Sequence, residues 1–152
     1  MGIHYLDTSA LVKLYVREPG TDQMIRLANP SSGHTIAILG LARLEFRSAI
    51  RLRERMGDVS PDLAAEAIAR MDVHLQTLYL VQPVTEAVLE EAAGLLDRHA
   101  LRAYDAVQLA GCLALRAQAG EVPSFVCSDR PLLLAAEQEG LGVIDPTADQ
   151  SP

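Results

Sequence analysis

The sequence predicts an α/β fold in which a mostly parallel sheet carries helices on both faces. Short apolar or β-branched runs alternate with longer segments of helical periodicity along the 152 residues, as expected for parallel strands joined by helical crossovers. The chain contains no Asn-Gly pair, which is the strongest signal of a tight hairpin. Asp7 and Asp129 each follow a predicted strand, and ligands of open parallel sheets bind at the carboxyl ends of the strands.

Five short segments have the composition of buried strands. The first is the apolar run IHYL, the second is the β-branched run HTIAI, and Pro83 closes the third. The predicted strands are 3–6, 34–38, 78–84, 124–128 and 142–145. No segment between them reads as a repeat or a linker, so all five are assigned to one sheet.

The helices are predicted from apolar periodicity and from signals at their ends. Ser60 followed by Pro61 is typical of a cap and first turn, Thr85 is a second cap, and Gly57 ends the helix that begins near Leu41. The predicted helices are 9–16, 21–27, 41–55, 61–75, 86–98, 103–117 and 131–139, and NPSSG at 29–33 is predicted as a loop.

Composition indicates a globular protein, with 49% hydrophobic and 22% charged residues. The length suits one domain, which we assign to 1–146, with a flexible tail at 147–152. No apolar run reaches the roughly 18 residues that a membrane span needs, and no secretory signal is evident. Cys112 and Cys127 are expected to be small buried residues, so we expect a cytoplasmic protein.

The net charge of −7 restricts the possible partners. It argues against a DNA-binding protein that works through general attraction to phosphates. A nucleic-acid substrate would need local positive charge to overcome the repulsion. A bound divalent cation would provide it.

Four carboxylates occupy positions that solvation explains poorly. Asp7 directly follows the first strand, and Asp129 follows the fourth. Glu45 lies between two apolar residues early in a helix, and Asp105 lies in the first turn of an almost wholly apolar helix. Unpaired carboxylates at the edge of a core are costly, so these four residues are the candidate functional set.

Each carboxylate taken alone also has a structural explanation. Asp7 and Asp129 can cap the helices that follow them. Asp105 can complement a helix dipole, which is worth roughly 0.3–1 kcal/mol, and Glu45 can pair with a nearby arginine on an exposed face. These explanations weaken when four separate segments converge at one end of one sheet, because clustered carboxylates repel one another.

A hard cation between the four carboxylates would account for their convergence. Mg²⁺ and Mn²⁺ prefer oxygen ligands, so either ion is the expected cofactor. The histidines are scattered without the spacing of a zinc site; they are His4, His34, His74 and His99.

Four stretches of the chain resemble the motifs of PIN-domain nucleases, and more closely those of the VapC-type toxin ribonucleases of bacterial toxin–antitoxin pairs. They are YLDTSALVKLY, LARLEFRSAI, LRAYDAVQLA and FVCSDRPLLLAAEQEGLGVIDP. They occur in the order of the family and cover nearly the whole chain. The first, third and fourth are specific, whereas a glutamate between apolar residues, as in the second, is common.

The resemblance implies a PIN-like α/β/α sandwich with a central parallel sheet of about five strands, and a Mg²⁺- or Mn²⁺-dependent endoribonuclease. The acidic metal-binding set that it implies is Asp7, Glu45, Asp105 and Asp129. Thr8 matches the hydroxyl residue after the first aspartate, and Ser128 lies where the family often has Thr or Ser. Arg102 and Arg130 flank the site in sequence and are either phosphate contacts or ordinary surface charges.

The resemblance also implies partners. They are an RNA substrate, a second copy in a homodimer, and a small antitoxin whose N-terminal part binds operator DNA. Apolar residues of the first two helices exceed what a short buried face needs and can serve either the core or an interface; they are Leu11, Leu14, Tyr15, Met24, Ile25 and Leu27. Apolar anchors of the antitoxin are expected beside the first three of these.

Three other functions compete with this interpretation. A phosphotransferase of the haloacid dehalogenase type needs an aspartate two residues after the first, where this chain has Ser9. A receiver-type signalling domain needs a lysine after a late strand, and the only lysine is Lys13. A catalytically silent PIN-like module that only binds RNA or protein is the third, and the intact acidic set argues against it.

Overall fold

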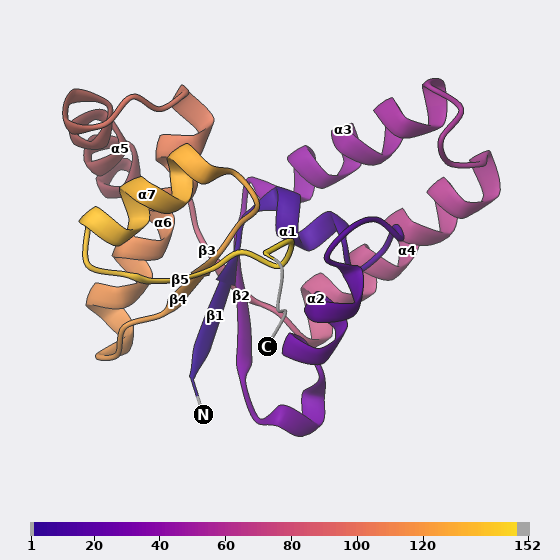
Figure 1. The fold of residues 1–152 in the computed structure, drawn as a ribbon, viewed down its shortest axis with the longest axis horizontal. Coiled ribbons are helices and arrows are strands. Elements are labelled where there is room, and N and C mark those ends of the chain that lie inside the picture. Colours follow the sequence, from indigo (N-terminus) through magenta and orange to yellow (C-terminus); the bar gives the residue numbers. More distant parts are fainter. Residues whose placement is uncertain (1, 149–152) are drawn as a thin grey trace.

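The computed structural model describes residues 2–148 as a sheet covered by helices on both faces (Figure 1). The strands are β1 (Ile3–Leu6), β2 (Thr35–Leu39), β3 (Leu80–Gln82), β4 (Ser124–Val126) and β5 (Gly142–Ile144). The helices are α1 (Thr8–Val12), α2 (Thr21–Leu27), α3 (Ala42–Arg55), α4 (Pro61–Thr77), α5 (Glu86–Arg98), α6 (Ala103–Ala119) and α7 (Arg130–Gln138), with a 3₁₀ turn, η1 (Pro30–Ser32), in the predicted loop.

The sheet is parallel throughout, with strand order β3-β2-β1-β4-β5. The chain builds outward from β1 to β3, then crosses back through α5 and α6 to β4 on the other side of β1. Because crossovers between parallel strands are right-handed, this reversal puts α1–α4 on one face and α5–α7 on the other (Figure 1). The predicted α/β/α sandwich with a five-stranded parallel sheet is confirmed.

Alternating strand residues build a separate core on each face of the sheet. Tyr5 and Phe125 point toward α5–α7, whereas Leu6, Ile38 and Val126 point toward α1–α4. Both sets are fully buried, which explains why the strands read as nearly continuous apolar runs. The two cores hold the carboxyl ends of β1 and β4 side by side.

The two predicted elements that shorten most are the first helix and the third strand. The helix predicted for 9–16 ends at Val12, because the backbone tightens to i→i+3 hydrogen bonds that continue to Tyr15. The strand predicted for 78–84 is confined to β3, because the Leu78 N–H still bonds to the last turn of α4. Periodicity therefore located both segments but not their ends.

The apolar residues of α1 and α2 belong mostly to the core. Leu11 and Met24 are fully buried. The partly buried residues that pack against the same core are Leu14, Tyr15 and Leu27. Of these residues only Ile25 is half exposed, at 50%. Their number therefore does not itself support a homodimer, and that expectation rests on the family resemblance.

The remaining expectations concern the chain ends, the cysteines and the membrane. The tail predicted for 147–152 lies outside the described residues from 149 onward, and Thr147 closes a turn by donating its N–H to Asp145 Oδ1 at 2.9 Å. Cys112 and Cys127 are buried and unbridged. Within residues 2–148 no helix has the length and apolar character of a membrane span.

The cap of α4 gives a direct test of the predicted helix signals. Ser60 Oγ accepts the N–H of Leu63 at 3.2 Å, ahead of Pro61 in the first turn. We expect Ser60→Ala to lower the free energy of unfolding by about 1 kcal/mol, because that N–H loses its acceptor. Urea unfolding followed by circular dichroism measures the change. Ser60→Asp keeps an acceptor and should stay near wild type, and equal stability of the alanine variant would contradict the capping role.

Candidate active site

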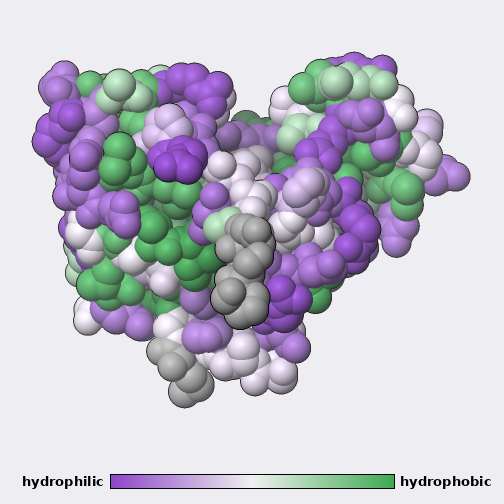
Figure 2. All heavy atoms as spheres, viewed as in Figure 1, coloured by the Kyte–Doolittle hydropathy of each residue, from purple (hydrophilic) through white to green (hydrophobic). Residues whose placement is uncertain are grey.

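The four predicted carboxylates line one cleft of about 870 Å³. Asp7 and Asp129 follow the adjacent strands β1 and β4, beside which the strand order reverses. Glu45 reaches the cleft from α3 and Asp105 from α6. In the space-filling view the molecule is hollowed between the α5–α7 side and the projecting α3–α4 hairpin (Figure 2). The structure thus brings together carboxylates from four separate segments.

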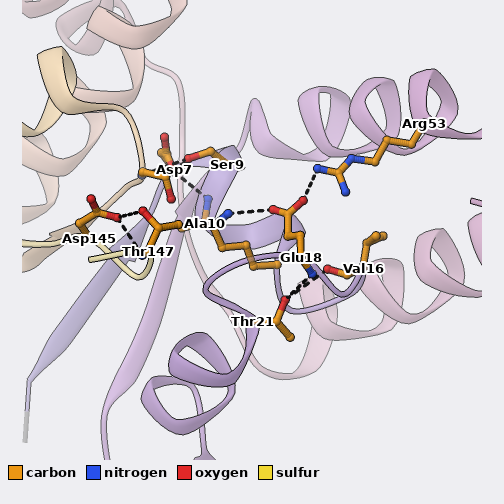
Figure 3. A network of polar contacts seen from close by, with 11 residues as sticks. Asp7, Ser9, Ala10, Val16, Glu18, Thr21, Arg53, Asp145 and Thr147 are labelled. Atoms are coloured by element: carbon orange, nitrogen blue, oxygen red, sulfur yellow. Dashed lines mark hydrogen bonds and ion pairs between the residues drawn. The ribbon is translucent and has the colours of Figure 1, made fainter. Parts of the chain in front are cut away.

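Asp7 is both a helix cap and a buried acid. Its Oδ1 accepts the Ala10 N–H at 2.9 Å and the Ser9 hydroxyl at 2.7 Å (Figure 3), so the capping explanation is correct as far as it goes. A cap does not need to be buried, yet Asp7 is only 6% exposed. Burial raises the pKa of Asp7, the hydrogen bonds lower it, and the negative charge of Asp105 raises it further.

Glu45 is half-buried and lies within the electrostatic influence of the other acids. Burial raises the pKa of Glu45, a hydrogen bond from Gln108 lowers it, and the charges of Asp7 and Asp105 raise it. Among residues 2–148 no ion pair reaches Glu45, so the arginine pairing considered from the sequence does not occur. The charge of Asp105 therefore disfavours the charged forms of Asp7 and Glu45, and the charge of Asp7 also disfavours that of Glu45.

Arg102 is a basic side chain that pairs with two of the cleft carboxylates, Asp105 and Asp129. Its Nε donates to Asp105 Oδ2 at 3.1 Å, and its Nη2 lies 3.8 Å from Asp129 Oδ2. The guanidinium also stacks on the Tyr104 ring, 5.0 Å from its centre. Asp129 Oδ1 accepts the Leu132 N–H at 3.2 Å and caps α7. Asp129 therefore combines a capping role with a place in the cleft, as Asp7 does.

The donor set of the cleft fits a hard divalent cation. All four residues offer charged oxygen atoms, the ligands that Mg²⁺ and Mn²⁺ prefer, and only Asp105 and Asp129 among them pair with the Arg102 guanidinium within residues 2–148. In the part of the chain that the structure describes, no three acidic, histidine or cysteine side chains meet closely enough to form a metal cage. The arrangement is an open acidic cleft rather than a closed set of ligands.

The other sequence-predicted residues divide between the cleft and its surroundings. Thr8 lines the cleft, and its Oγ1 accepts from Gln108 Nε2 at 3.2 Å. Ser128 and Arg130 lie outside the lining. The backbone N–H of Ser128 donates to Ser9 Oγ at 3.4 Å, while its buried hydroxyl has no partner among residues 2–148. Arg130 is exposed at the start of α7.

Sequence reasoning missed an ion-pair cluster in the wall of the cleft. Glu18 Oε1 accepts from Lys13 Nζ at 2.9 Å, and Glu18 also pairs with Arg53 of α3 (Figure 3). The side chains of Lys13 and Glu18 are only 8% and 14% exposed, so this pair is better shielded than an ordinary surface pair. The cluster fastens the segment after α1 to α3. Arg53 lies 35 residues from Glu18, so no local sequence signal predicts that pair.

Gln108 was also missed, although a signal existed. It is 2% exposed and lies three residues after Asp105, on the same face of an otherwise apolar helix. A buried amide must find partners, and here they are Glu45 and Thr8. A polar residue within the apolar stretch of a helix, one turn after a candidate acid, is the pattern that would have identified it.

The residues expected beside the antitoxin anchors lie apart from the acidic cleft. Leu11 is fully buried, and Leu14 and Tyr15 line a different cavity, whose wall includes residues that precede β2 and β3. The apolar residues that do line the acidic cleft are Val12, Pro19, Ala49, Leu52 and Tyr104. Ala49 and Leu52 lie on α3, Val12 on α1, Pro19 on the segment after α1, and Tyr104 on α6.

Sequence comparisons agree on one family. The PIN-domain family model matches residues 4–120. Ribonuclease VapC46 of Mycobacterium tuberculosis is 32% identical over 147 residues, which cover 97% of this chain and 100% of the relative.

Solved structures share the fold at low sequence identity. FitAcB from Neisseria gonorrhoeae superposes with a TM-score of 0.64 at 15% identity, covering 96% of this chain and 98% of that one. VapBC2 from Rickettsia felis, bound to a promoter DNA fragment, gives 0.62 at 11% identity, covering 93% and 97%. VapC20 from Mycobacterium tuberculosis, a toxin that cleaves the sarcin-ricin loop, gives 0.60 at 19% identity, covering 91% and 95%. This chain therefore belongs to the PIN-domain family, in its group of VapC-type ribonucleases.

Proposed function

We propose that this chain is a Mg²⁺- or Mn²⁺-dependent endoribonuclease. The observation that carries the proposal is the convergence of four carboxylates from four elements in one cleft, with the pKa of Asp7 and of Glu45 raised by burial. Such a cluster is electrostatically unfavourable until a cation joins it. Asp7, Asp105 and Asp129 would hold the cation, and Glu45 would be a further ligand or a base.

Hydrolysis of a phosphodiester needs an activated water and neutralised charge on the phosphate. A bound divalent cation supplies both. Glu45 would orient the attacking water and accept its proton, because burial moves the pKa of this carboxyl toward the range where a general base works. Two hydrogen bonds to Asp7 Oδ1 orient this carboxylate in the cleft.

Two further side chains would contact the RNA phosphate at the cleft. Thr8 lines the cleft and its Oγ1 is held by a hydrogen bond from Gln108, so its hydroxyl would lie within reach of a phosphate oxygen bound there. Arg102 is 66% exposed, so it can leave Asp105 and Asp129 for a phosphate once a cation compensates their charge. Ser128 and Arg130, beside Asp129, would meet nucleotides outside the cleft.

We also propose that the protein is the toxin of a toxin–antitoxin pair in the cytoplasm and acts as a homodimer. The net charge of −7 and the acidic cleft suit a small basic antitoxin. An arginine or lysine from its C-terminal segment would pair with Asp7, Asp105 or Asp129, while apolar anchors pack against Leu52. Several of the solved structures with this fold are toxin–antitoxin complexes.

The first test of this function is cleavage of RNA by purified protein. We expect cleavage with Mg²⁺ or Mn²⁺, loss of cleavage in EDTA, and recovery when excess metal is added. Asp105→Asn protein purified in parallel controls for contaminating nucleases and should be inactive. Equal cleavage in EDTA would contradict the metal mechanism.

The second test separates the catalytic role of Asp7 from its cap. Asp7→Asn keeps an acceptor for Ala10 and removes the charge, so we expect activity to fall by at least about 100-fold. Because the folded-state pKa is raised, ionised Asp7 opposes folding above that pKa, and below the unfolded pKa the penalty is absent. The melting temperature of the metal-free asparagine variant at pH 7 should therefore equal or exceed that of wild type.

Asp7→Ala is the matched control, since it removes both the charge and the cap. We expect it to be about 1 kcal/mol less stable than Asp7→Asn, measured by thermal unfolding without metal. If Asp7→Asn is unfolded although it keeps an acceptor for the cap, the carboxylate is structural and the catalytic assignment fails.

The toxin role is tested by expression in a bacterium. Wild-type protein alone should arrest growth, whereas Asp7→Asn should not, since it lacks the metal-binding charge. Co-expression of a small gene adjacent to this one should restore growth, and its product should co-purify with the wild-type protein. If wild-type expression is harmless and no small protein co-purifies tightly, the toxin assignment fails, while the assignment to the ribonuclease family stands.

A further inference from the structure

A buried glutamine joins three elements of the cleft. Gln108 on α6 is 2% exposed, and its Nε2 lies 3.0 Å from Glu45 Oε1 and 3.2 Å from Thr8 Oγ1. The amide nitrogen has two hydrogens, so one donor is available for each acceptor. A single side chain therefore ties α6 to the start of α1 and to α3, one turn away from Asp105.

The orientation of this amide is fixed from both sides. An ionised carboxylate can only accept hydrogen bonds, so the nitrogen faces Glu45 and the oxygen faces away. There the Tyr5 hydroxyl donates to Gln108 Oε1 over 3.5 Å. Tyr5 is fully buried, so this contact lies inside the core.

Gly111 makes room for that tyrosine. A Cβ at this position would lie 2.5 Å from the Tyr5 hydroxyl oxygen and 2.6 Å from Leu39 Cδ1. Glycine inside a helix is about 1 kcal/mol less favourable than alanine, and here the close approach of α6 to β1 and β2 requires it. The absence of a side chain at Gly111 lets the Tyr5 hydroxyl lie against α6, where it meets the amide of Gln108.

We infer that Gln108 is a positioning residue that holds the Glu45 carboxylate and the Thr8 hydroxyl in place for the proposed hydrolysis. This inference rests on the function proposed above and adds a residue to it. Because Thr8 Oγ1 accepts a hydrogen bond from the amide, the hydroxyl keeps its place beside Glu45 in the cleft. Because Glu45 is held at a fixed distance from α6, its carboxylate keeps its place relative to Asp105. Misplacement of such groups by about 1 Å can cost on the order of 100-fold in rate.

The main test is Gln108→Met, which nearly conserves volume and removes both donors. We expect kcat to fall about 10- to 100-fold with a much smaller change in KM, and the affinity for Mn²⁺ to fall about tenfold, as when outer partners of metal ligands are lost. Kinetics on RNA and calorimetric titration of the apoprotein with Mn²⁺ measure these quantities. Gln118→Met is the control, because Gln118 is exposed on the same helix and the substitution is identical. It should leave both unchanged.

A second variant distinguishes positioning from mere packing. Tyr5→Phe keeps the ring in the core and removes only the hydroxyl that orients the amide. We expect a smaller loss of kcat in the same direction, and no further loss when Tyr5→Phe is added to Gln108→Met, because the hydroxyl acts through the amide. Losses of kcat that multiply in the double variant would overturn the inference.

Failure of this inference differs from failure of the proposed function. If wild-type protein with Mn²⁺ cleaves no RNA, the proposed function fails. The affinity for Mn²⁺ then decides the positioning role of Gln108. Weaker Mn²⁺ binding by Gln108→Met supports that role, and equal binding overturns it. If wild type cleaves RNA while Gln108→Met retains full kcat and full Mn²⁺ affinity, Gln108 does not position the site and the ribonuclease proposal stands.

Discussion

Repulsion among four carboxylates at one edge of the sheet is the constraint on which the rest of the site depends. The parallel strand order reverses beside β1, so the ends of β1 and β4 meet, and helices α3 and α6 add two more acids. Each acid has a compensating contact. Backbone N–H groups cap Asp7 and Asp129, Arg102 pairs with Asp105, and Gln108 donates to Glu45. These contacts partly compensate the negative charges of the four carboxylates and leave the cleft open.

The structural and functional explanations of Asp7 and Asp129 turn out to be compatible. Both residues begin helices through one carboxylate oxygen, and both line the cleft. The N-terminus of a helix is an electropositive place for an acid, so the caps also ease the burial of negative charge. This is why an asparagine at position 7 is expected to preserve the fold while removing the chemistry.

The wall of the cleft that α3 forms combines acidic, apolar and basic side chains. One face of α3 carries Glu45 beside the carboxylates and, farther along, Leu52 and Arg53. Arg53 pairs with Glu18, which ties this part of α3 to the segment after α1. A basic, amphipathic partner matches such a surface better than a purely basic one, because charge pairs guide association while apolar anchors supply affinity.

The sequence alone determined the alternation of strands and helices, the caps at Ser60 and Thr85, and the four acids, because strand periodicity, helix periodicity and capping are local properties of the chain. Only the tertiary structure decided which contacts the acids make. The bonds from Gln108 to Glu45 and to Thr8 span 63 and 100 residues, and the pairing of Arg53 with Glu18 spans 35. Such contacts depend on how closely α3 and α6 approach β1. That distance is set by packing at positions such as Gly111, where the absence of a side chain admits the Tyr5 hydroxyl, and no local pattern encodes it.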